Sequence, residues 1–211
     1  MRATAVIGDA SAPFADARKW ATVEVMAALP DHRMTVDEYL AWAQRQAGRF
    51  ELFDGLVYAM TPERAVHAEI KLAIHMALVA AIRARGLPCH VLPDGMTVRV
   101  DQSAAYEPDA VVYCGSKLPP SALEVTSPII VVEVLSPSSQ HIDASLKLAG
   151  YFRLPSVAHY LIVDPDKPLV IHHSRRSDDS ILTRIARDGV VTLDPPGLEL
   201  SLADIYGGAG S

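Results

Sequence analysis

The stretch Pro128-Ile129-Ile130-Val131-Val132-Glu133-Val134-Leu135 decides how this chain folds. It is apolar at nearly every position, so both faces of a strand over 129–135 would avoid water. That pattern is typical of a central strand covered on both sides of its sheet. Glu133 falls late in this run, where a carboxylate is costly unless it is paired or bound to a metal ion. The segment predicts the middle of a sheet and a candidate site near its end.

A second acid and a lysine flank this strand in the sequence. In Glu107-Pro108-Asp109 the proline keeps the preceding residue out of helical geometry and places Asp109 at the mouth of another strand. Lys147 lies on a helix expected over 144–153, which should pack back onto the strand of Glu133. Acids supply the hard oxygen ligands that Mg²⁺ prefers, and a lysine can orient water or stabilise developing charge. The pattern favours a metal-dependent phosphodiester hydrolase.

The same residues have structural explanations, which the sequence leaves open. Glu133 could pair with an arginine or with Lys147 and serve the fold alone. Asp143 and Lys147 stand four residues apart on one helical face, and such pairs are more often solvated salt bridges.

Turn and capping signals predict most of the remaining elements. Asp54-Gly55 between two apolar runs indicates a hairpin, and Thr35 with Glu38 three residues later is typical of a capped helix start. We expect helices over 17–29, 35–42, 64–85 and 144–153, strands over 89–92, 97–100, 110–113 and 129–135, and hairpins over 50–60, 159–173 and 181–193. This order predicts an α/β fold: a mixed central sheet flanked by helices, with additional β-hairpins.

Composition and charge bound the class of protein. The net charge of -6 counts against a dedicated nucleic-acid binder with a basic surface, but active-site acids would themselves contribute to it. The two cysteines, Cys89 and Cys114, fit no zinc spacing and build no disulfide framework, which favours a reducing cytoplasm. We find no secretory signal and no apolar run of about 18 residues, so no membrane is expected. Residues 1–30 are expected to form a leader, and 31–211 a single domain.

Further acids and histidines are weaker candidates. Glu51, in the first hairpin, could be a third acid near the metal, although hairpin glutamates are commonly just exposed. His67, at the start of the long helix, could touch phosphate or support the metal ligands, although such histidines are more often surface residues. His159, His172 and His173 could cluster across the second hairpin, but the last two alternate faces and do not easily share one metal.

The ordered set of motifs closely resembles the Uma2 family of bacterial endonucleases. The family is a branch of the PD-(D/E)XK, or restriction-endonuclease-like, superfamily, and the resemblance spans about residues 34–205. It rests on Phe50-Glu51-Leu52-Phe53-Asp54-Gly55, Glu107-Pro108-Asp109, Val132-Glu133-Val134-Leu135-Ser136-Pro137-Ser138-Ser139, Lys147 with Tyr151, and Tyr160-Leu161-Ile162-Val163-Asp164-Pro165.

The resemblance implies Mg²⁺-dependent hydrolysis of DNA phosphodiesters. Asp109 matches the aspartate of the PD motif, and Glu133 matches the acid of the second motif. Leu135 stands where the lysine of (D/E)-X-K would be, so the resemblance implies that Lys147 takes over its role. Glu51 resembles an extra glutamate of the fold.

From these matches we expect Asp109, Glu133 and the carbonyl of Val134 to hold Mg²⁺ (or Mn²⁺). Lys147 would assist, and His67 would be an accessory group.

Two other functions fit the same sequence. One is a non-catalytic module that binds nucleic acid or protein on the same fold, which the acidic net charge and the missing lysine at 135 favour. The other is an assembly subunit that dimerises through hairpin edges and the long apolar helix. Dimerisation is compatible with catalysis, and we expect a homodimer acting on DNA.

Overall fold

The computed structural model describes residues 29–135 and 144–207 of the 211-residue chain. Within these residues the helices are α1 (Val36–Ala43), α2 (Ala65–Arg85), α3 (Ala144–Tyr151) and α4 (Leu202–Tyr206). The strands are β1 (Phe50–Phe53), β2 (Leu56–Ala59), β3 (Cys89–Pro93), β4 (Val98–Arg99), β5 (Ala105–Tyr106), β6 (Ala110–Cys114), β7 (Pro128–Val134), β8 (His159–Val163), β9 (Val170–Arg175), β10 (Ile181–Ala186), β11 (Val190–Leu193) and β12 (Leu198–Ser201). The helix predicted over 17–29 lies, apart from Leu29, outside the described residues.

A six-stranded sheet forms the centre of the fold, in the order β10-β9-β8-β7-β6-β3. β7 and β8 run parallel and every other neighbouring pair is antiparallel, so the sheet is mixed, as predicted. β7 is an interior strand: Val132 and Val134 contribute to one core and Val131 to the other. The prediction of a central strand covered on both faces is confirmed.

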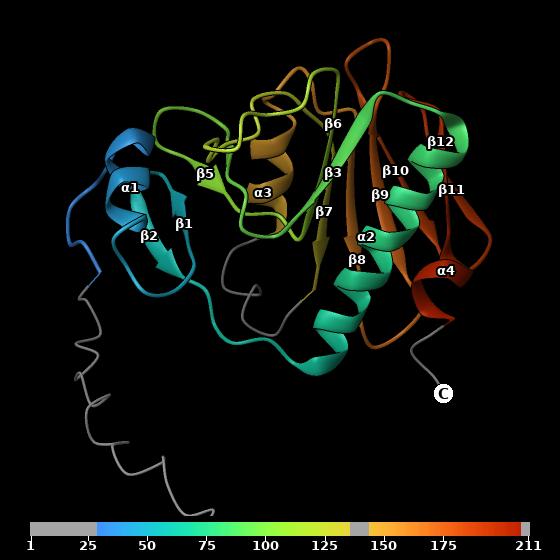
Figure 1. Ribbon diagram of the computed structural model, residues 1–211, viewed down its shortest axis with the longest axis horizontal. Helices are drawn as coiled ribbons and strands as arrows, with labels where there is room; N and C mark the ends of the chain where they lie inside the picture. Colours follow the sequence, from blue (N-terminus) through green and yellow to red (C-terminus); the bar gives the residue numbers. More distant parts are fainter. Residues whose placement is uncertain (1–28, 136–143, 208–211) are drawn as a thin grey trace, which may run out of the picture.

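The two cores separate the layers of the molecule. On one face of the sheet, α2, α4 and the β11–β12 hairpin cover a core that includes Ile70, Ile74 and Leu193. On the other face, α3 and the loops around β4 and β5 enclose a core centred on Tyr151 and Tyr160. α2 packs along one face of the large sheet (Figure 1).

A smaller sheet, β2-β1-β5-β4, lies beside the large one and carries α1 (Figure 1). The predicted capping box is present: Glu38 N donates to Thr35 Oγ1 at 3.3 Å, and Thr35 N donates to Glu38 Oε2 at 2.8 Å. The predicted hairpin turn is confirmed as well. Gly55 has a φ of +76°, and an added Cβ would meet the carbonyl oxygen of Met34 at 3.2 Å, so only glycine fits.

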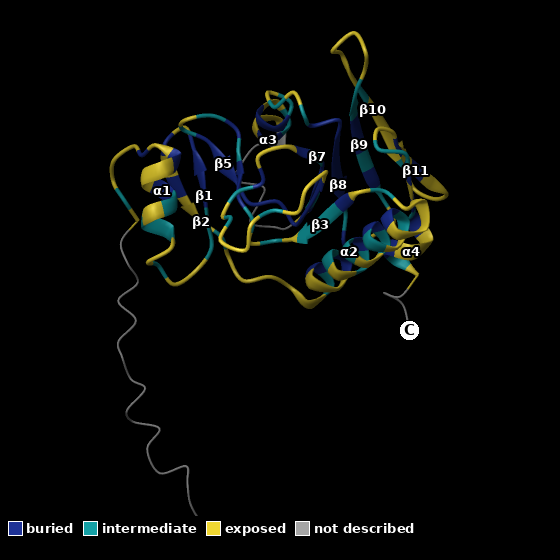
Figure 2. Cartoon of the chain, turned by 45° about the horizontal axis from the view of Figure 1, so that its top comes forward, coloured by how far each residue is buried: buried dark blue, intermediate teal, exposed yellow. Residues whose placement is uncertain are grey.

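The buried stripe of α2 explains why this helix is apolar. Ile70, Ile74, Leu78 and Ile82 are buried against the sheet, while Leu72 and Met76 are exposed on the opposite side (Figure 2). By length and composition alone α2 would also suit a membrane span. Its buried stripe instead shows the packing of a core helix.

One predicted strand pairing was wrong. The segment 181–193 is not a hairpin: β10 pairs with β9 as an edge of the large sheet, and β11 pairs with β12. β10 gains a longer partner this way, because the β9–β10 register spans six residue pairs and β11 has only four residues.

The cysteines were also misjudged. Cys89 and Cys114 are direct partners in the β3–β6 register and form a disulfide, which a separation of 25 residues conceals in the sequence. The cysteines therefore no longer support a reducing compartment, and the cytoplasmic location stays a prediction.

Candidate active site

Acidic and basic side chains from both sheets and two helices meet where β6 begins and β7 ends. β1 contributes Glu51, the segment before β6 contributes Glu107 and Asp109, β7 contributes Glu133, α2 contributes His67 and Lys71, and α3 contributes Lys147 and Tyr151. The predicted site residues Asp109, Glu133, Lys147, Glu51 and His67 are therefore neighbours in the fold. Their roles stay predictions.

Asp109 is fixed at the end of β7 by the backbone. Its N–H donates to the carbonyl of Val132 at 3.0 Å, and its Oδ2 accepts from the N–H of Val134 at 2.7 Å. The side chain is 6% exposed. A carboxylate held in this way has one oxygen occupied by the backbone and the other, Oδ1, directed at Lys71 Nζ at 3.2 Å.

Glu133 faces the opposite side of β7 and meets α3. Its Oε1 accepts from Lys147 Nζ at 2.8 Å and from the hydroxyl of Tyr151 at 2.7 Å. Burial raises the pKa of Glu133 to about 7, even though Lys147 opposes this rise. Near neutral pH this carboxyl is therefore poised between its charged and neutral forms.

Glu51 completes this half of the site. Its Oε1 accepts from Lys147 Nζ at 2.9 Å and from the N–H of Glu107 at 2.9 Å. Burial works against a charge on Lys147, but the carboxylates of Glu133 and Glu51 outweigh it and raise the lysine pKa. Lys147 is thus a permanent cation between two buried acids. The sequence left open that Glu133 pairs with Lys147, and the structure shows this pair.

His67 lies on the other side of β7, against the residues that hold Asp109. Its Nε2 is 2.9 Å from the carbonyl oxygen of Val134 and 3.9 Å from Asp109 Oδ2, and its Nδ1 is 3.1 Å from Glu63 Oε2. A neutral imidazole can donate to only one of these oxygens. The ring therefore bridges the start of α2 and the end of β7, and it is buried rather than a surface group.

Lys71 and Arg49 extend the cluster toward solvent. Lys71 Nζ contacts Glu63 Oε1 at 2.7 Å as well as Asp94, and Arg49 pairs with Glu63, Asp94 and Glu107. Burial raises the pKa of Glu107, although the charge of Arg49 opposes it. Arg49 Nη2 is buried and has no hydrogen-bond partner among the described residues.

The charges of the cluster do not balance. Six carboxylates are linked by these contacts to three permanent cations, Arg49, Lys71 and Lys147. Three negative charges are left over when all six acids are ionised and His67 is neutral. Such an excess is costly where the acids are buried, and it is relieved either by protonation, as the raised pKa of Glu133 indicates, or by a bound cation.

The donor atoms fit a divalent cation. Ligand atoms of Glu63, His67 and Asp109 lie within 4.8 Å of one another, and the Val134 carbonyl faces the same space through its contact with His67. Carboxylate and carbonyl oxygens suit Mg²⁺ and Mn²⁺. Of the predicted ligands, Asp109 and the Val134 carbonyl lie on this side, whereas Glu133 Oε1 is held by Lys147 and Tyr151 on the other.

Comparison with known proteins identifies the family of this chain. A model of the Uma2 family, described as "Putative restriction endonuclease", matches residues 36–204. This chain belongs to the Uma2 family. "Uncharacterized protein slr1290" of Synechocystis sp. is 27% identical over 181 residues, which cover 85% of this chain and 94% of that protein.

A solved structure supports the fold of this Uma2 protein. The crystal structure of a "putative nuclease belonging to DUF820" from Anabaena variabilis matches with a TM-score of 0.65 and 18% identity. The match covers 82% of this chain and 98% of that one. Such a low identity shows the fold alone. Family and fold together support a nuclease.

Sequence reasoning missed several members of the Uma2 cluster. His67 was predicted, but Glu63, which lies just before α2, and Lys71, which follows His67 by four residues on the helix, were not; their spacing of four residues on either side of His67 could have revealed them. Asp94 sits before Gly95 and resembles an ordinary turn residue, and Arg49 carries no local signal.

Two other predicted groups of residues, the pair Asp143–Lys147 and the three histidines of the second hairpin, have different outcomes. Asp143 lies outside the described residues, so its pairing with Lys147 stays a prediction. His159 and His172 do touch, with Nδ1 and Nε2 2.9 Å apart, whereas His173 bonds to Thr183.

Proposed function

We propose that this Uma2 protein is a metal-dependent endonuclease that hydrolyses the phosphodiester bonds of DNA. The observation that carries the proposal is one cluster of acids and cations at the end of β7, with Asp109 and the Val134 carbonyl on one side of the strand and Glu133, bonded to Lys147, on the other. Two acids, a carbonyl oxygen and a lysine at adjoining strand ends match the donor set that the sequence motifs imply. The family, described as "Putative restriction endonuclease", and the fold support a nuclease.

Asp109, Glu133 and the Val134 carbonyl would hold Mg²⁺ or Mn²⁺. Such an ion, when bound, polarises a phosphate and lowers the pKa of a coordinated water. Glu63 and His67 offer further ligand atoms on the Asp109 side.

Lys147 is the residue placed to assist the reaction. Its ammonium is 2.8 Å from Glu133 and 2.9 Å from Glu51, so two acids fix its position and keep it charged. A fixed cation beside the acids can orient an attacking water and stabilise negative charge that develops on the phosphate. Glu51, which holds both Lys147 and the backbone at Glu107, acts through that lysine and is a positioning residue.

His67, Lys71 and Arg49 serve the substrate side of this proposal. Lys71 neutralises Asp109 at 3.2 Å, and Arg49, whose side chain is 33% exposed, adds a second cation beside the acids. Such cations attract the phosphate groups of a substrate. His67 keeps the Val134 carbonyl in place through its Nε2.

A cleavage assay with matched variants tests the proposal. Supercoiled plasmid and single-stranded DNA are incubated with wild type and with Glu133→Gln, in Mg²⁺ and in Mn²⁺. The control is Glu69→Gln, which makes the same change on the exposed side of α2. We expect wild type and Glu69→Gln to cut and Glu133→Gln to be inactive while remaining folded by circular dichroism.

Direct metal binding separates this function from a non-catalytic scaffold. Titration calorimetry with Mn²⁺ should give binding to wild type that Asp109→Asn loses. Full cleavage by Glu133→Gln would refute the role of that acid. Neither cleavage nor metal binding by wild type would leave the binding module as the function of this fold.

We further propose that the protein acts as a homodimer, because cutting both strands of a duplex favours two copies. Sedimentation that gives only a 22.8 kDa species at working concentrations would refute the dimer.

A further inference from the structure

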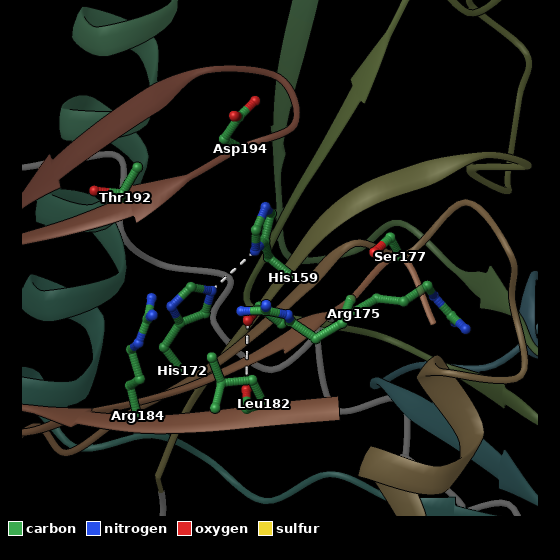
Figure 3. A pocket seen from close by; sticks show the side chains of 10 residues that line it. His159, His172, Arg175, Ser177, Leu182, Arg184, Thr192 and Asp194 are labelled. Atoms are coloured by element: carbon green, nitrogen blue, oxygen red, sulfur yellow. Dashed lines mark hydrogen bonds between the residues drawn. The ribbon is translucent and has the colours of Figure 1, made fainter. Parts of the chain in front are cut away.

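A second polar pocket lies among β8, β9, β10 and the segment that follows β11. Its volume is about 350 Å³, which is at the small end of ligand sites. The lining is His159, His172, Ser174, Arg175, Arg176, Ser177, Leu182, Arg184, Thr192 and Asp194. The active-site residues described above are not part of it, and Figure 3 shows His159, His172 and Arg184 near one another, with Thr192 and Asp194 at the edge.

The pocket is cationic in a protein of net charge -6. The donors of Arg175 are used within the protein: they donate to the carbonyls of Val157, Phe152 and Leu154, and the guanidinium pairs with Asp179. Arg176 and Arg184 have no ion pair within the described part of the chain. Two uncommitted guanidinium groups at one cavity are the usual means of binding a phosphate.

The two histidines place a hydrogen-bond acceptor beside these cations. His159 Nε2 donates to the carbonyl of Pro195 at 2.9 Å, so in the neutral ring its Nδ1 accepts from His172 Nε2. Burial lowers the pKa of both rings, that of His172 to about 4 with help from the charges of His159 and Arg184. The neutral pair leaves His172 Nδ1 as an acceptor.

The strand register puts this acceptor next to a free arginine. Arg184 on β10 is the direct partner of His172 on β9, and Figure 3 shows the guanidinium beside the imidazole. Asp194 supplies a second acceptor in the lining, and the hydroxyls of Ser177 and Thr192 can donate or accept. The pocket thus offers cations for an anion and acceptors for neutral N–H or O–H groups.

We propose that this pocket binds a small phosphate monoester that also carries hydrogen-bond donors, with a nucleoside monophosphate as the best match. Arg176 and Arg184 bind the phosphate oxygens. His172 Nδ1 and the Asp194 carboxylate accept from hydroxyl or amino groups of the same molecule. A bare phosphate would leave these acceptors unused, and an uncharged nucleoside would leave the arginines unpaired.

Titration calorimetry of the full chain without metal or DNA tests the pocket, using AMP, inorganic phosphate and adenosine. AMP should bind more tightly than inorganic phosphate, and adenosine should not bind. Arg184→Gln and Arg176→Gln should each weaken AMP binding about tenfold or more, because each removes a charge-assisted contact. Asp194→Asn should weaken AMP but leave phosphate unchanged.

Arg83→Gln is the matched control, since Arg83 is exposed on α2 and does not line the pocket. It should bind AMP as wild type does. Absence of AMP binding to wild type at millimolar concentration would overturn the proposal. Binding of AMP by Arg184→Gln and Arg176→Gln with the affinity of wild type would overturn it as well. These results do not depend on cleavage, so they stand apart from the test of the nuclease.

Discussion

Replacing Lys147 by methionine would leave two buried acids without their cation. Glu51 and Glu133 have side chains that are 5% and 14% exposed, and both accept from Lys147 Nζ. Methionine keeps the length and the apolar contacts of the lysine stem but removes the charge. Among the described residues, Glu133 would keep only the Tyr151 hydroxyl, and Glu51 only the backbone N–H of Glu107.

The expected cost is large and depends on pH. Breaking one side of a buried ion pair costs about 3–5 kcal/mol of unfolding free energy. Glu133 has a folded pKa of about 7, against an ordinary value of 4.5. Because the unfolded chain releases this proton first, wild type loses stability as pH rises from 4.5 to 7 and then no more from this group.

The variant should continue to lose stability above pH 7. Lys147 lowers the pKa of Glu133, so its removal raises the folded value further. Each added unit amounts to about 1.4 kcal/mol, lost as pH rises through the new folded pKa. The difference between Lys147→Met and wild type is therefore expected to be smaller at pH 6 than at pH 9.

Urea unfolding followed by circular dichroism at pH 6 and pH 9 measures this difference. Lys117→Met is the control, because Lys117 is exposed and its loss should change stability by less than about 0.5 kcal/mol. Saturating Mg²⁺ should recover part of the deficit, since a bound cation replaces the missing charge. A deficit below about 1 kcal/mol, or one equal at both pH values, would refute the buried charge balance described for this site.

Three other predictions test separate parts of the structure. Asp109→Asn should remove Mn²⁺ binding in calorimetry and lower plasmid cleavage by at least about a hundredfold, while unchanged metal binding would exclude the residue as a ligand. Reduction of Cys89–Cys114, which are 25 residues apart, should lower the free energy of unfolding by about 3 kcal/mol in urea, and a double serine variant should not respond to dithiothreitol. Gly150→Ala should lower the free energy of unfolding by about 1–3 kcal/mol and slow cleavage, because the new Cβ would lie 2.6 Å from a ring carbon of Tyr106. Thermal unfolding measures this change, and a variant as stable as wild type would contradict the close approach.

The sequence was sufficient where local chemistry determines structure. The apolar run of β7 and the Asp54-Gly55 turn each specify one arrangement, and both are present. Because strand ends and the following helix must lie close together, the same reasoning brought Glu133 and Lys147 into contact and placed Asp109 beside the end of the same strand. The order of the elements is therefore enough to predict which residues are neighbours when the strand is central.

Long-range pairing could not be inferred in the same way. β10 is largely exposed, so its sequence does not distinguish β9 from β11 as its partner. The Cys89–Cys114 bond depends on β3 lying beside β6, which no local pattern specifies. Asp94 belongs to the active site because its turn lies next to Lys71 in the fold. The sequence does not indicate this, because Asp before Gly is common in ordinary turns.

The position of the lysine follows from the geometry of β7. Side chains two residues apart on a strand lie on the same face, so a lysine at position 135 would project on the face that Glu133 occupies. α3 packs over that face, through the core that contains Tyr151 and Val131. An ammonium from Lys147 therefore reaches the Glu133 carboxylate from the side on which a lysine at 135 would lie, at 2.8 Å. If the protein is the nuclease proposed above, α3 would supply through Lys147 the positive charge that a lysine at position 135 would otherwise bring to this face of β7.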